Sequence, residues 1–501
     1  MPAAIARRLP NLLMPISWSP WHPDAFARAR AEAKPVLLSI SATWSHWCRE
    51  MDRTSYADET VAEQVNSRFV PVRVDADRRP DIMERYGLGG LPTTAFLTAE
   101  GAIVTGGTFV SVGRFATVLS QVADAFAARR EEIAARSMAA GERSSPAPAA
   151  APRSDSLLDA ILQTYDAAHG GFGTGPKFPL TAPLHLALDL HAETGDAVWR
   201  AMVECTLDAM GSGDLHDQVD GGFFRSATSR DWTLPQREKL LPVNAALLGV
   251  LVDAGTVLNV ARYADVAAGI IRYAQTWLAD QAEGGWGGSQ CADELYFSLR
   301  TPAERAAQTA PPVDRTLYSV WNGAMISAAL RAAHTTNDAA LGEFAIASLE
   351  RVLLLCYRPG AGVAHYFDGE PRVRGLLDDQ IAMATAALDA AEATGTVPYE
   401  MMAEELALYV LRTMWDEHAG GLRDRAPGND PDDIGLLRRT VKPFVSNCEA
   451  SRLFARLATV SGNHEFADRA RETLASIAPC AAQQGPLAAH YLLAVREAGL
   501  R

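Results

Sequence analysis

The sequence is poor in lysine. Of its 46 basic residues, 42 are arginines and only four are lysines, namely Lys34, Lys177, Lys239 and Lys442. Arginine replaces lysine freely on a surface, but not at a site that needs a compact and titratable ammonium group. The shortage itself indicates a general bias toward arginine, and it makes the four remaining lysines worth locating.

Other absences restrict the class of protein. The net charge is −14 and no basic block could neutralise phosphates, so neither a nucleic-acid nor an anionic-membrane partner is expected. No run of 18 apolar residues predicts a membrane span, and residues 1–13 lack the pattern of a signal peptide. The six cysteines form no Cys-x-x-Cys pair, which argues against a disulfide scaffold or a Cys-rich zinc module and predicts a cytoplasmic protein.

A linker separates two regions of different periodicity. Residues 137–153 consist mainly of Pro, Ser and Ala and cannot bury an apolar face. The chain has 501 residues, 48% of them hydrophobic, which is enough for two to four domains with large cores. We predict an N-terminal domain over residues 1–136 and a C-terminal domain over residues 154–501.

The N-terminal region alternates strands with helices. Residues 36–40 form an apolar run typical of a buried strand, and residues 69–75 alternate apolar and polar side chains. Residues 94–97 and 103–105 predict an antiparallel pair, and a helical stretch is expected at about residues 47–67. This order predicts an α/β layer with a partly parallel sheet.

Regular glycine signals divide the C-terminal region. Double glycines or close variants alternate strictly with small-Gly-polar stops, which end one helix and begin the next. The helices are expected near residues 155–168, 182–193, 196–211, 239–254, 259–281, 316–335, 339–357, 376–393, 398–415, 445–460, 464–478 and 485–499. Six helical hairpins predict a closed all-α (α/α)6 toroid, with an open solenoid as the alternative. In a ring, the long aromatic loops would line a pocket at one end.

The turn after the first strand points to a known family. It reads Ser45-His46-Trp47-Cys48, and Leu91-Pro92 lies further along. With the segments around Trp18–Trp21, Lys34-Pro35 and Arg79-Pro80-Asp81, these residues resemble the thioredoxin-like domain of the spermatogenesis-associated protein family. That family occurs in bacteria and animals, and we expect a bacterial member. The resemblance implies a thioredoxin fold and a cis peptide bond before Pro92.

This chain departs from the family at one thiol. The family pattern is Cys-His-Trp-Cys, whereas position 45 here is serine, so the attacking thiol is missing. A dithiol–disulfide cycle needs both sulfur atoms, and we expect no such activity. Two interpretations of Cys48 stay open: a single-thiol role, or a small buried hydrophobic residue.

The resemblance continues beyond the linker. The matching segments include Gly170-Gly171-Phe172, Glu238-Lys239, Trp321-Asn322-Gly323 and Asp378-Asp379. In this family the region resembles the six-hairpin toroids of sugar-processing enzymes, including acylglucosamine epimerases and certain glycosidases. The resemblance therefore implies a carbohydrate-like small-molecule ligand.

Residue types in the expected pocket suit such a ligand. Aromatic rings can cover the C–H face of a sugar, forked polar groups can bind its hydroxyls, and carboxylates or a lysine can transfer protons. The candidates for binding are Phe172, Lys177, Phe178, Arg225, Trp232, Trp286, Trp321 and Asn322, and those for catalysis are Asp217, Glu238, Lys239, Asp293 and Asp379. The adjacent Glu238 and Lys239 are the strongest pair, because a charged neighbour could shift the pKa of either group. The alternatives are ion pairs, helix caps and core packing.

Further departures leave catalysis an open question. Two family histidines are replaced by Gln218 and Gln236, and a family aspartate is replaced by Cys291. His169, His216 and His365 remain near the double-glycine loops and keep a proton shuttle conceivable. No spacing indicates a metal site or a nucleotide loop, so no metal and no cofactor are expected. The sequence leaves the oligomeric state open.

Three hypotheses follow. The first is a carbohydrate-binding enzyme or former enzyme of the epimerase, isomerase or glycosidase type. The second is a redox or chaperone-like protein that uses Cys48 alone, and the third is a non-catalytic binding protein with degenerate sites. A convergence of Glu238, Asp293 and Asp379 would favour the first, and a buried Cys48 would exclude the second. If the loops converge, Lys177, Lys239 and Lys442 should approach one pocket mouth.

Overall fold

The computed structural model describes residues 16–129, 132–133, 153–428 and 431–500. The chain forms two compact units, one comprising Met1–Pro146 and Gly428–Arg439 and the other Ala147–Pro427 and Thr440–Arg501. The expected linker, residues 137–153, lies outside the described residues except for Arg153. The short segment Gly428–Arg439 belongs to the first unit, although the predicted domain boundaries assign it to the second.

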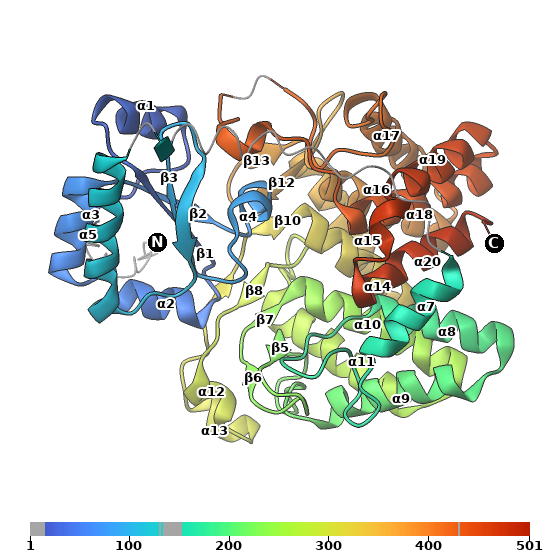
Figure 1. Ribbon diagram of the computed structural model, residues 1–501. Helices are drawn as coiled ribbons and strands as arrows, with labels where there is room; N and C mark the ends of the chain where they lie inside the picture. Colours follow the sequence, from blue (N-terminus) through green and yellow to red (C-terminus); the bar gives the residue numbers. More distant parts are fainter. Residues whose placement is uncertain (1–15, 130–131, 134–152, 429–430, 501) are drawn as a thin grey trace, which may run out of the picture. The chain divides into compact units, whose positions relative to one another are not determined.

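A four-stranded mixed sheet forms the centre of the first unit (Figure 1). Strand β1 (Val36–Ser41) pairs in parallel with β2 (Val70–Asp75) and antiparallel with β3 (Thr93–Leu97). Strand β3 also pairs antiparallel with β4 (Ile103–Gly107), which gives the order β2-β1-β3-β4. All four strands lie where the apolar runs and alternations predict them, and the thioredoxin-like fold class is confirmed.

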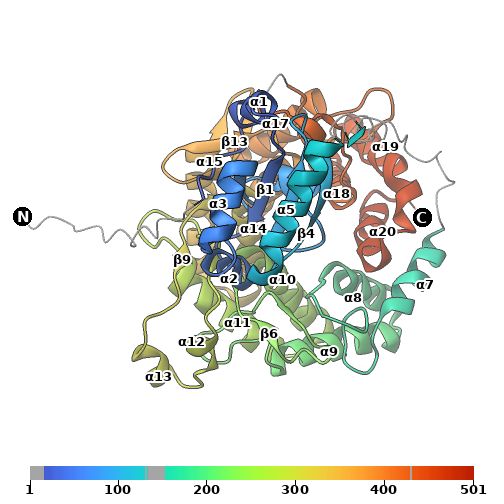
Figure 2. The same cartoon turned by 60° about the vertical axis from the view of Figure 1, so that its left-hand side comes forward.

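Helices cover both faces of this sheet. They are α1 (Pro23–Ala31), α2 (His46–Arg53), α3 (Glu59–Arg68), α4 (Pro80–Tyr86) and α5 (Val112–Ala128). Side chains of α1 and α4 share one core with the sheet, and those of α2, α3 and α5 share the other. Helices α3 and α5 run side by side in both views (Figures 1 and 2). The predicted helix at 47–67 is two helices, because Asp58 begins α3 by accepting a hydrogen bond from Val61 N.

The segment Gly428–Arg439 completes the core of the first unit. It contains a 3₁₀ turn, η2 (Gly435–Arg438), and buries Ile434 and Leu437 in the core that contains α1 and α4. The hydroxyl of Tyr86 donates a hydrogen bond to Gly101 O at 2.7 Å and accepts one from Leu436 N at 2.9 Å. A segment between two toroid helices, Val397–Thr413 and Phe444–Ser461, thus supplies part of the thioredoxin-like core.

The second unit is a closed ring of helical hairpins. The inner helices are α8 (Ala182–Thr194), α10 (Leu241–Leu258), α14 (Ser319–Thr336), α16 (Leu377–Thr394), α18 (Phe444–Ser461) and α20 (Ala488–Glu497). The outer helices are α7 (Ser154–Thr164), α9 (Ala197–Ser212), α11 (Arg262–Tyr273, continued by a π turn to Leu278), α15 (Ala339–Cys356), α17 (Val397–Thr413) and α19 (His464–Ala481). Each inner helix packs on the next, and α20 packs on α8. The predicted (α/α)6 toroid is confirmed, and the open solenoid is wrong.

Short elements in the loops escape the helix pattern. They are the helices α12 (Glu294–Ser298) and α13 (Pro302–Ala306), the 3₁₀ turn η3 (Gly485–Leu487) and the strands β5 (Ser226–Ala227), β6 (Pro235–Gln236), β7 (Lys239–Leu240), β8 (Ser289–Gln290), β9 (Val313–Asp314), β10 (Leu317–Tyr318), β11 (Tyr357–Arg358), β12 (Gly362–Phe367) and β13 (Pro371–Arg374). Most of these strands precede inner helices, so they lie at the end of the ring where the inner helices begin, which we call its N-terminal end. Among the described helices, α10 alone has the length and apolar composition of a membrane span, and 61% of it is buried inside the protein.

Candidate functional site

The double-glycine loops are copies of one structural device. In four of them an aspartate precedes the glycine pair, and its N–H donates to the carbonyl of the second glycine at 2.9–3.0 Å. The aspartates are Asp166, Asp217, Asp280 and Asp416. In each loop a cation binds both the aspartate Oδ2 and the carbonyl oxygen of the first glycine. The cations are Lys177, Lys239, Arg351 and Lys442 in that order.

This geometry explains three of the four lysines. Lys177 and Lys239 are fully buried, and each is bound to its own loop. Buried ammonium groups cannot line an open pocket mouth, so the prediction that the three lysines meet there is wrong. Burial lowers the pKa of Lys239 to about 8, although Asp217 opposes this shift. Burial would raise the pKa of Asp217, but Lys239 and Arg305 outweigh it and bring that pKa to about 2.

Glu238 and Lys239 do not act on one another. Lys239 is the first residue of strand β7 and Glu238 directly precedes it, and successive side chains of an extended chain point to opposite sides. Lys239 turns to Asp217, whereas Glu238 is buried and accepts a 2.6 Å hydrogen bond from Arg225 Nε. The prediction that these neighbours tune each other's pKa is therefore wrong. Glu238 and Arg225 form an ion pair of the kind that the alternative interpretation expects.

The predicted carboxylates bind different partners. Asp293 is exposed and begins helix α12 by accepting a hydrogen bond from Tyr296 N at 2.9 Å. Asp379 is buried in the first turn of α16 and contacts His365. No contact joins Glu238, Asp293 and Asp379 within the described part of the chain, so the structure does not bring them together as one catalytic set.

Most of the predicted sugar-binding aromatics are core residues. Phe172, Trp232 and Trp286 are buried, and the Trp232 Nε1 donates to His169 O at 2.9 Å. Asn322 is buried and supports the loop at Trp286 through both its Oδ1 and its Nδ2. Phe178 is 49% exposed and Trp321 is half-buried, so these two keep ring surface for a ligand.

A histidine and an aspartate form the most distinctive polar pair of the toroid. His365 lies on β12, and its Nδ1 is 3.0 Å from both Oδ1 and Oδ2 of Asp379. Val320 N donates to Asp379 Oδ1 at 3.2 Å and helps to fix the carboxylate. A carboxylate at Nδ1 holds the imidazole in one orientation and favours the tautomer that carries its proton on Nδ1. From the sequence, His365 is noted only as one of three histidines near the double-glycine loops, with His169 and His216.

Asp378 lies directly before Asp379 in the sequence. It is not among the site residues that the sequence predicts. Its side chain is exposed, yet the surrounding protein desolvates the carboxylate and raises its pKa. Ser446 and His365 oppose this rise, whereas Asp379 and Asp424 reinforce it. An accessible carboxyl group with a raised pKa can keep a proton to donate, which is the property of a general acid.

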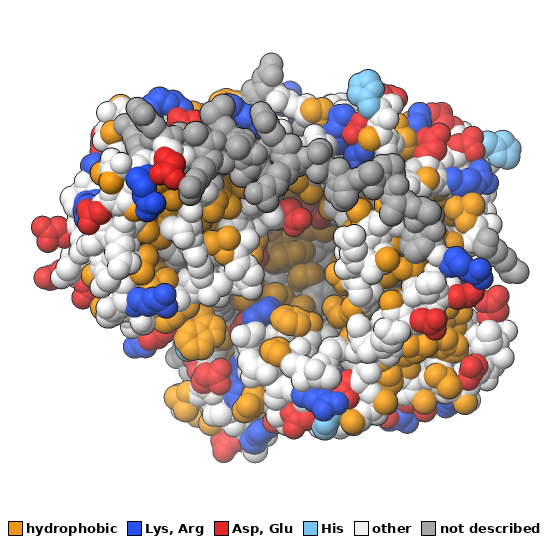
Figure 3. Space-filling view, viewed as in Figure 1, with side chains coloured by type: hydrophobic (Ala, Val, Ile, Leu, Met, Phe, Trp, Pro, Cys, Tyr) orange, Lys and Arg blue, Asp and Glu red, His pale blue; other side chains and the backbone are white. Residues whose placement is uncertain are grey.

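Aromatic rings lie beside these polar groups. The ring centroid of Tyr318 is 4.3 Å from that of Trp321 and 5.7 Å from that of His365. Tyr318 belongs to β10 and Trp321 to the first turn of α14, so both lie at the N-terminal end of the ring with Asp378 and Asp379. Figure 3 shows the surface on this side of the molecule with its side chains coloured by type. Rings, a base and an acid thus occur together in one part of the toroid.

The thioredoxin-like turn lacks an accessible thiol. Cys48 is only 3% exposed, and burial raises its pKa although the Ser45 hydroxyl opposes the shift. Ser45 begins helix α2 and is itself buried. Trp47 is 48% exposed, and its ring lies 5.4 Å from His46 and 5.5 Å from Phe109. The predicted cis peptide before Pro92 is confirmed. A buried thiol with a raised pKa is a poor nucleophile, which contradicts the hypothesis of a single-thiol role.

No metal site emerges from this geometry. Among the described residues, no group of three or more His, Cys, Asp or Glu side chains could hold a metal ion. The pair of His365 and Asp379 with the neighbouring Asp378 is therefore the candidate site on which we base a function.

Comparisons with known proteins agree with both units. Residues 9–143 match the family described as "Protein of unknown function, DUF255", Thioredox_DsbH, and residues 294–480 match glycosyl hydrolase family 76. Spermatogenesis-associated protein 20 of Rattus norvegicus is 30% identical over 335 residues, which make up 61% of this chain and 41% of that protein. The chain thus spans about two fifths of the length of the curated relatives that it matches.

Solved structures resemble the toroid. A D-mannose isomerase gives a TM-score of 0.52 at 13% identity and covers 64% of this chain and 83% of its own. Cellobiose 2-epimerase from Bacillus thermoamylovorans gives a TM-score of 0.51 at 10% identity, with coverages of 63% and 82%. At these identities the similarity shows the fold alone.

The fold defines a class of protein in which a thioredoxin-like unit is joined to an (α/α)6 toroid. Within that class, the chain is similar to spermatogenesis-associated protein 20, at about 30% identity over about 60% of its own length. Its long matches include mammalian and nematode proteins, which lend no support to the expected bacterial source.

Proposed function

We propose that the second unit binds a carbohydrate-like small molecule and processes it by proton transfer at Asp378 and His365. The observation that carries this proposal is the position of an accessible carboxyl group of raised pKa beside a histidine held by a buried aspartate. In this function Asp378 is the general acid, His365 the general base and Asp379 its positioning residue. Tyr318 and Trp321 supply rings for the C–H face of the sugar.

The similar proteins favour the same substrate class. Residues 294–480 match a glycosyl hydrolase family, and the toroid shares its fold with a D-mannose isomerase and a cellobiose 2-epimerase. Isomerisation and epimerisation move a proton at a carbon next to a carbonyl group, whereas glycoside hydrolysis protonates a leaving oxygen. An acid and a base in one part of the toroid serve the first chemistry directly, so we place isomerisation or epimerisation first.

Proton exchange provides the direct test. The protein is incubated in D₂O with D-mannose and with cellobiose, and NMR follows deuterium incorporation at C2 together with the release of new reducing ends. We expect incorporation at C2 that Asp378→Asn lowers by about 100-fold or more. Glu465→Gln, which changes an exposed first-turn carboxylate on α19, should keep the wild-type rate. New reducing ends without C2 exchange would support a glycosidase instead, and no turnover by the folded protein would reject catalysis.

A non-catalytic binding role is the second candidate. One observation favours it: Asp217, Glu238 and Asp379 are all buried and occupied by cationic partners or by His365. Saturable sugar binding without turnover would support this role.

We further propose that the protein acts in the cytoplasm. We also propose that its first unit has no dithiol redox activity, because Ser45 replaces one thiol and Cys48 is buried.

A further inference from the structure

A cavity lies toward the C-terminal ends of the inner helices α14 and α16. It has a volume of about 600 Å³ and is formed by the C-terminal halves of α14 and α16, the middle of α18 and the last residue of α20. The lining includes neither Asp378, Asp379 nor His365. Its nearest residue on α16 is Thr385, six residues after Asp379, and at a rise of about 1.5 Å per residue this is about 9 Å of helix. The residues that form the cavity are therefore different from those of the site at Asp378 and His365.

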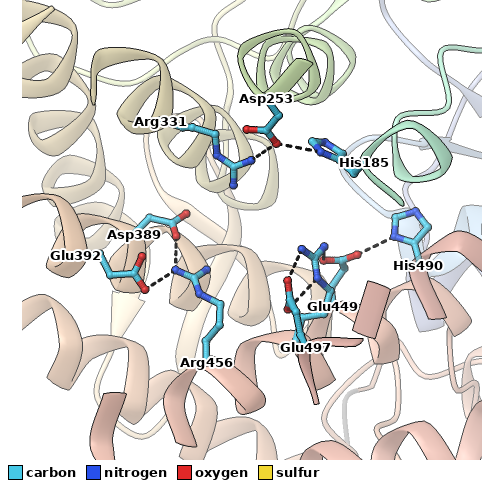
Figure 4. A network of polar contacts seen from close by, with 10 residues as sticks. His185, Asp253, Arg331, Asp389, Glu392, Glu449, Arg456, His490 and Glu497 are labelled. Atoms are coloured by element: carbon cyan, nitrogen blue, oxygen red, sulfur yellow. Dashed lines mark hydrogen bonds and ion pairs between the residues drawn. The ribbon is translucent and has the colours of Figure 1, made fainter. Parts of the chain in front are cut away.

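Three groups of ion pairs surround this cavity and point toward a common space (Figure 4). Arg331 Nη1 lies 2.6 Å from Asp253 Oδ2, which also contacts His185. Arg456 Nη2 contacts Asp389 at 2.6 Å and Glu392 at 2.9 Å. The third group contains Arg452, Glu449, Glu497 and His490. Positive and negative groups therefore alternate around the wall.

The ion pairs leave hydrogen-bonding capacity for a ligand. Arg331 and Arg456 each use one Nη atom, and their remaining guanidinium nitrogens have no hydrogen-bond partner within the described residues. Ser327 and Thr385 add hydroxyl groups to the wall, and the buried Leu330 and Leu453 add an apolar surface. Fixed donors, fixed acceptors and a small apolar surface are thus available together.

We propose that this cavity binds one neutral polyhydroxylated molecule, of the size of a monosaccharide, a cyclitol or a sugar alcohol. An anion would approach the carboxylates and a cation would approach the arginines, and like charges placed together cost binding energy. A guanidinium edge can donate to two adjacent hydroxyl oxygens, and a carboxylate can accept from two. The volume lies within the usual range for small-molecule pockets. This inference does not depend on the proposed function.

Calorimetry on the full chain tests the proposal. The probes are myo-inositol, D-mannitol and D-mannose, with inorganic phosphate and spermidine as charged comparisons. We expect at least one neutral probe to bind with a dissociation constant in the millimolar range or below, and tighter than both ions. Arg456→Gln should weaken this binding at least tenfold, and Thr385→Val, which keeps the shape but removes one hydroxyl, at least threefold.

Two further variants decide where the probe binds. Ala393 lines the cavity and is exposed, so Ala393→Trp fills the space without removing an ion pair and should abolish binding. Asp378→Asn alters only the other site and should leave this binding unchanged. If D-mannose occupies both sites, the wild type binds two molecules and Ala393→Trp binds one. Stronger binding of phosphate or spermidine, no binding of any neutral probe, or full binding by a folded Ala393→Trp protein would overturn the proposal.

Discussion

The imidazole Nδ1 of His365 lies 3.0 Å from both carboxylate oxygens of Asp379, and both side chains are buried. The histidine comes from a strand that precedes the helix carrying the aspartate, so the pair joins β12 to α16. A buried carboxylate beside a histidine orients the ring and stabilises its protonated form. This relationship makes His365 the base in the proposed reaction.

Asp379→Asn tests that relationship. The amide cannot supply the negative charge that stabilises a protonated His365, and we expect turnover to fall about 100-fold. The wild-type rate should fall at high pH as Asp378 loses its proton, and this fall should come above the ordinary carboxyl range because the pKa of Asp378 is raised. In Asp378→Asn the alkaline limb should disappear, and an unchanged alkaline limb would remove Asp378 from the mechanism.

Lys442 offers a test of the repeated loop device. Arg351 makes in the third hairpin the two contacts that Lys442 makes in the fifth, to an aspartate and to the first glycine carbonyl. We therefore expect Lys442→Arg to change the free energy of unfolding by less than about 1 kcal/mol. Lys442→Met removes the cation at Asp416 Oδ2 and leaves that carboxylate only the longer ion pair with Arg423, at 3.6 Å, so it should cost about 2 kcal/mol. Urea unfolding measures both, and an equal loss in both variants would mean that shape, and not charge, sets the requirement.

Asp416 predicts a pH window for stability. Burial would raise its pKa, but Lys442 and two backbone N–H groups outweigh burial and lower the pKa to about 2. A depressed folded-state pKa contributes stability above the ordinary value near pH 4, and this contribution is lost as the pH falls toward 2. For this carboxylate it amounts to roughly 2 kcal/mol. The melting temperature of the wild type should therefore fall below about pH 4, and Asp416→Asn should show a shallower fall from a lower starting value.

The sequence predicts the helices of this protein well, but it does not predict contacts between distant segments. Periodicity and glycine signals locate all twelve toroid helices within a few residues, because an amphipathic helix between two caps is a local property of the chain. The place of Gly428–Arg439 in the first unit is not a local property. It depends on hydrogen bonds of Leu436 with Tyr86 and of Asp432 with Trp21, which are about 350 to 410 positions away in the sequence. A pattern over a short stretch of sequence does not predict such contacts.

Site residues were harder to predict for a related reason. Glu238 and Lys239 look like a catalytic pair because they are adjacent, but a strand turns adjacent side chains to opposite sides. The double-glycine loops account for Lys177, Lys239 and Lys442, and a search for an Asp-x-x-x-Gly-Gly repeat could have found this structural role. The pair of His365 and Asp379 is 14 residues apart and has no local signal, and the catalytic role that the sequence predicts for Asp379 stays a prediction.

Ser45→Cys tests the state of the thioredoxin-like turn. The variant restores the Cys-His-Trp-Cys pattern, and Ser45 already lies near Cys48, whose N–H donates to the serine hydroxyl at 3.4 Å. After mild oxidation we expect a reversible disulfide, measured as the loss of two free thiols by mass spectrometry. The wild type and the double variant Ser45→Cys/Cys48→Ala should show no such loss. Insulin-reduction activity in the wild type would contradict the proposal that the unit lacks dithiol-type redox function.

Gly435→Ala tests whether Gly428–Arg439 is an integral part of the first unit. Gly435 has a φ of +57°, and a Cβ there would overlap the carbonyl oxygen of Gly101 and the hydroxyl of Tyr86. Gly462 is the matched control, because its φ is +70° and no atom lies within 4 Å of a Cβ.

Both substitutions carry the cost of a left-handed alanine, roughly 1 kcal/mol, and the first adds the steric cost of displacing a packed segment. We expect Gly435→Ala to lower the free energy of unfolding by about 3 kcal/mol and Gly462→Ala by about 1 kcal/mol. Limited proteolysis should then cleave near residues 428–439 in the first variant alone. Equal costs and equal proteolytic patterns would show that the segment does not pack on Gly101 in solution.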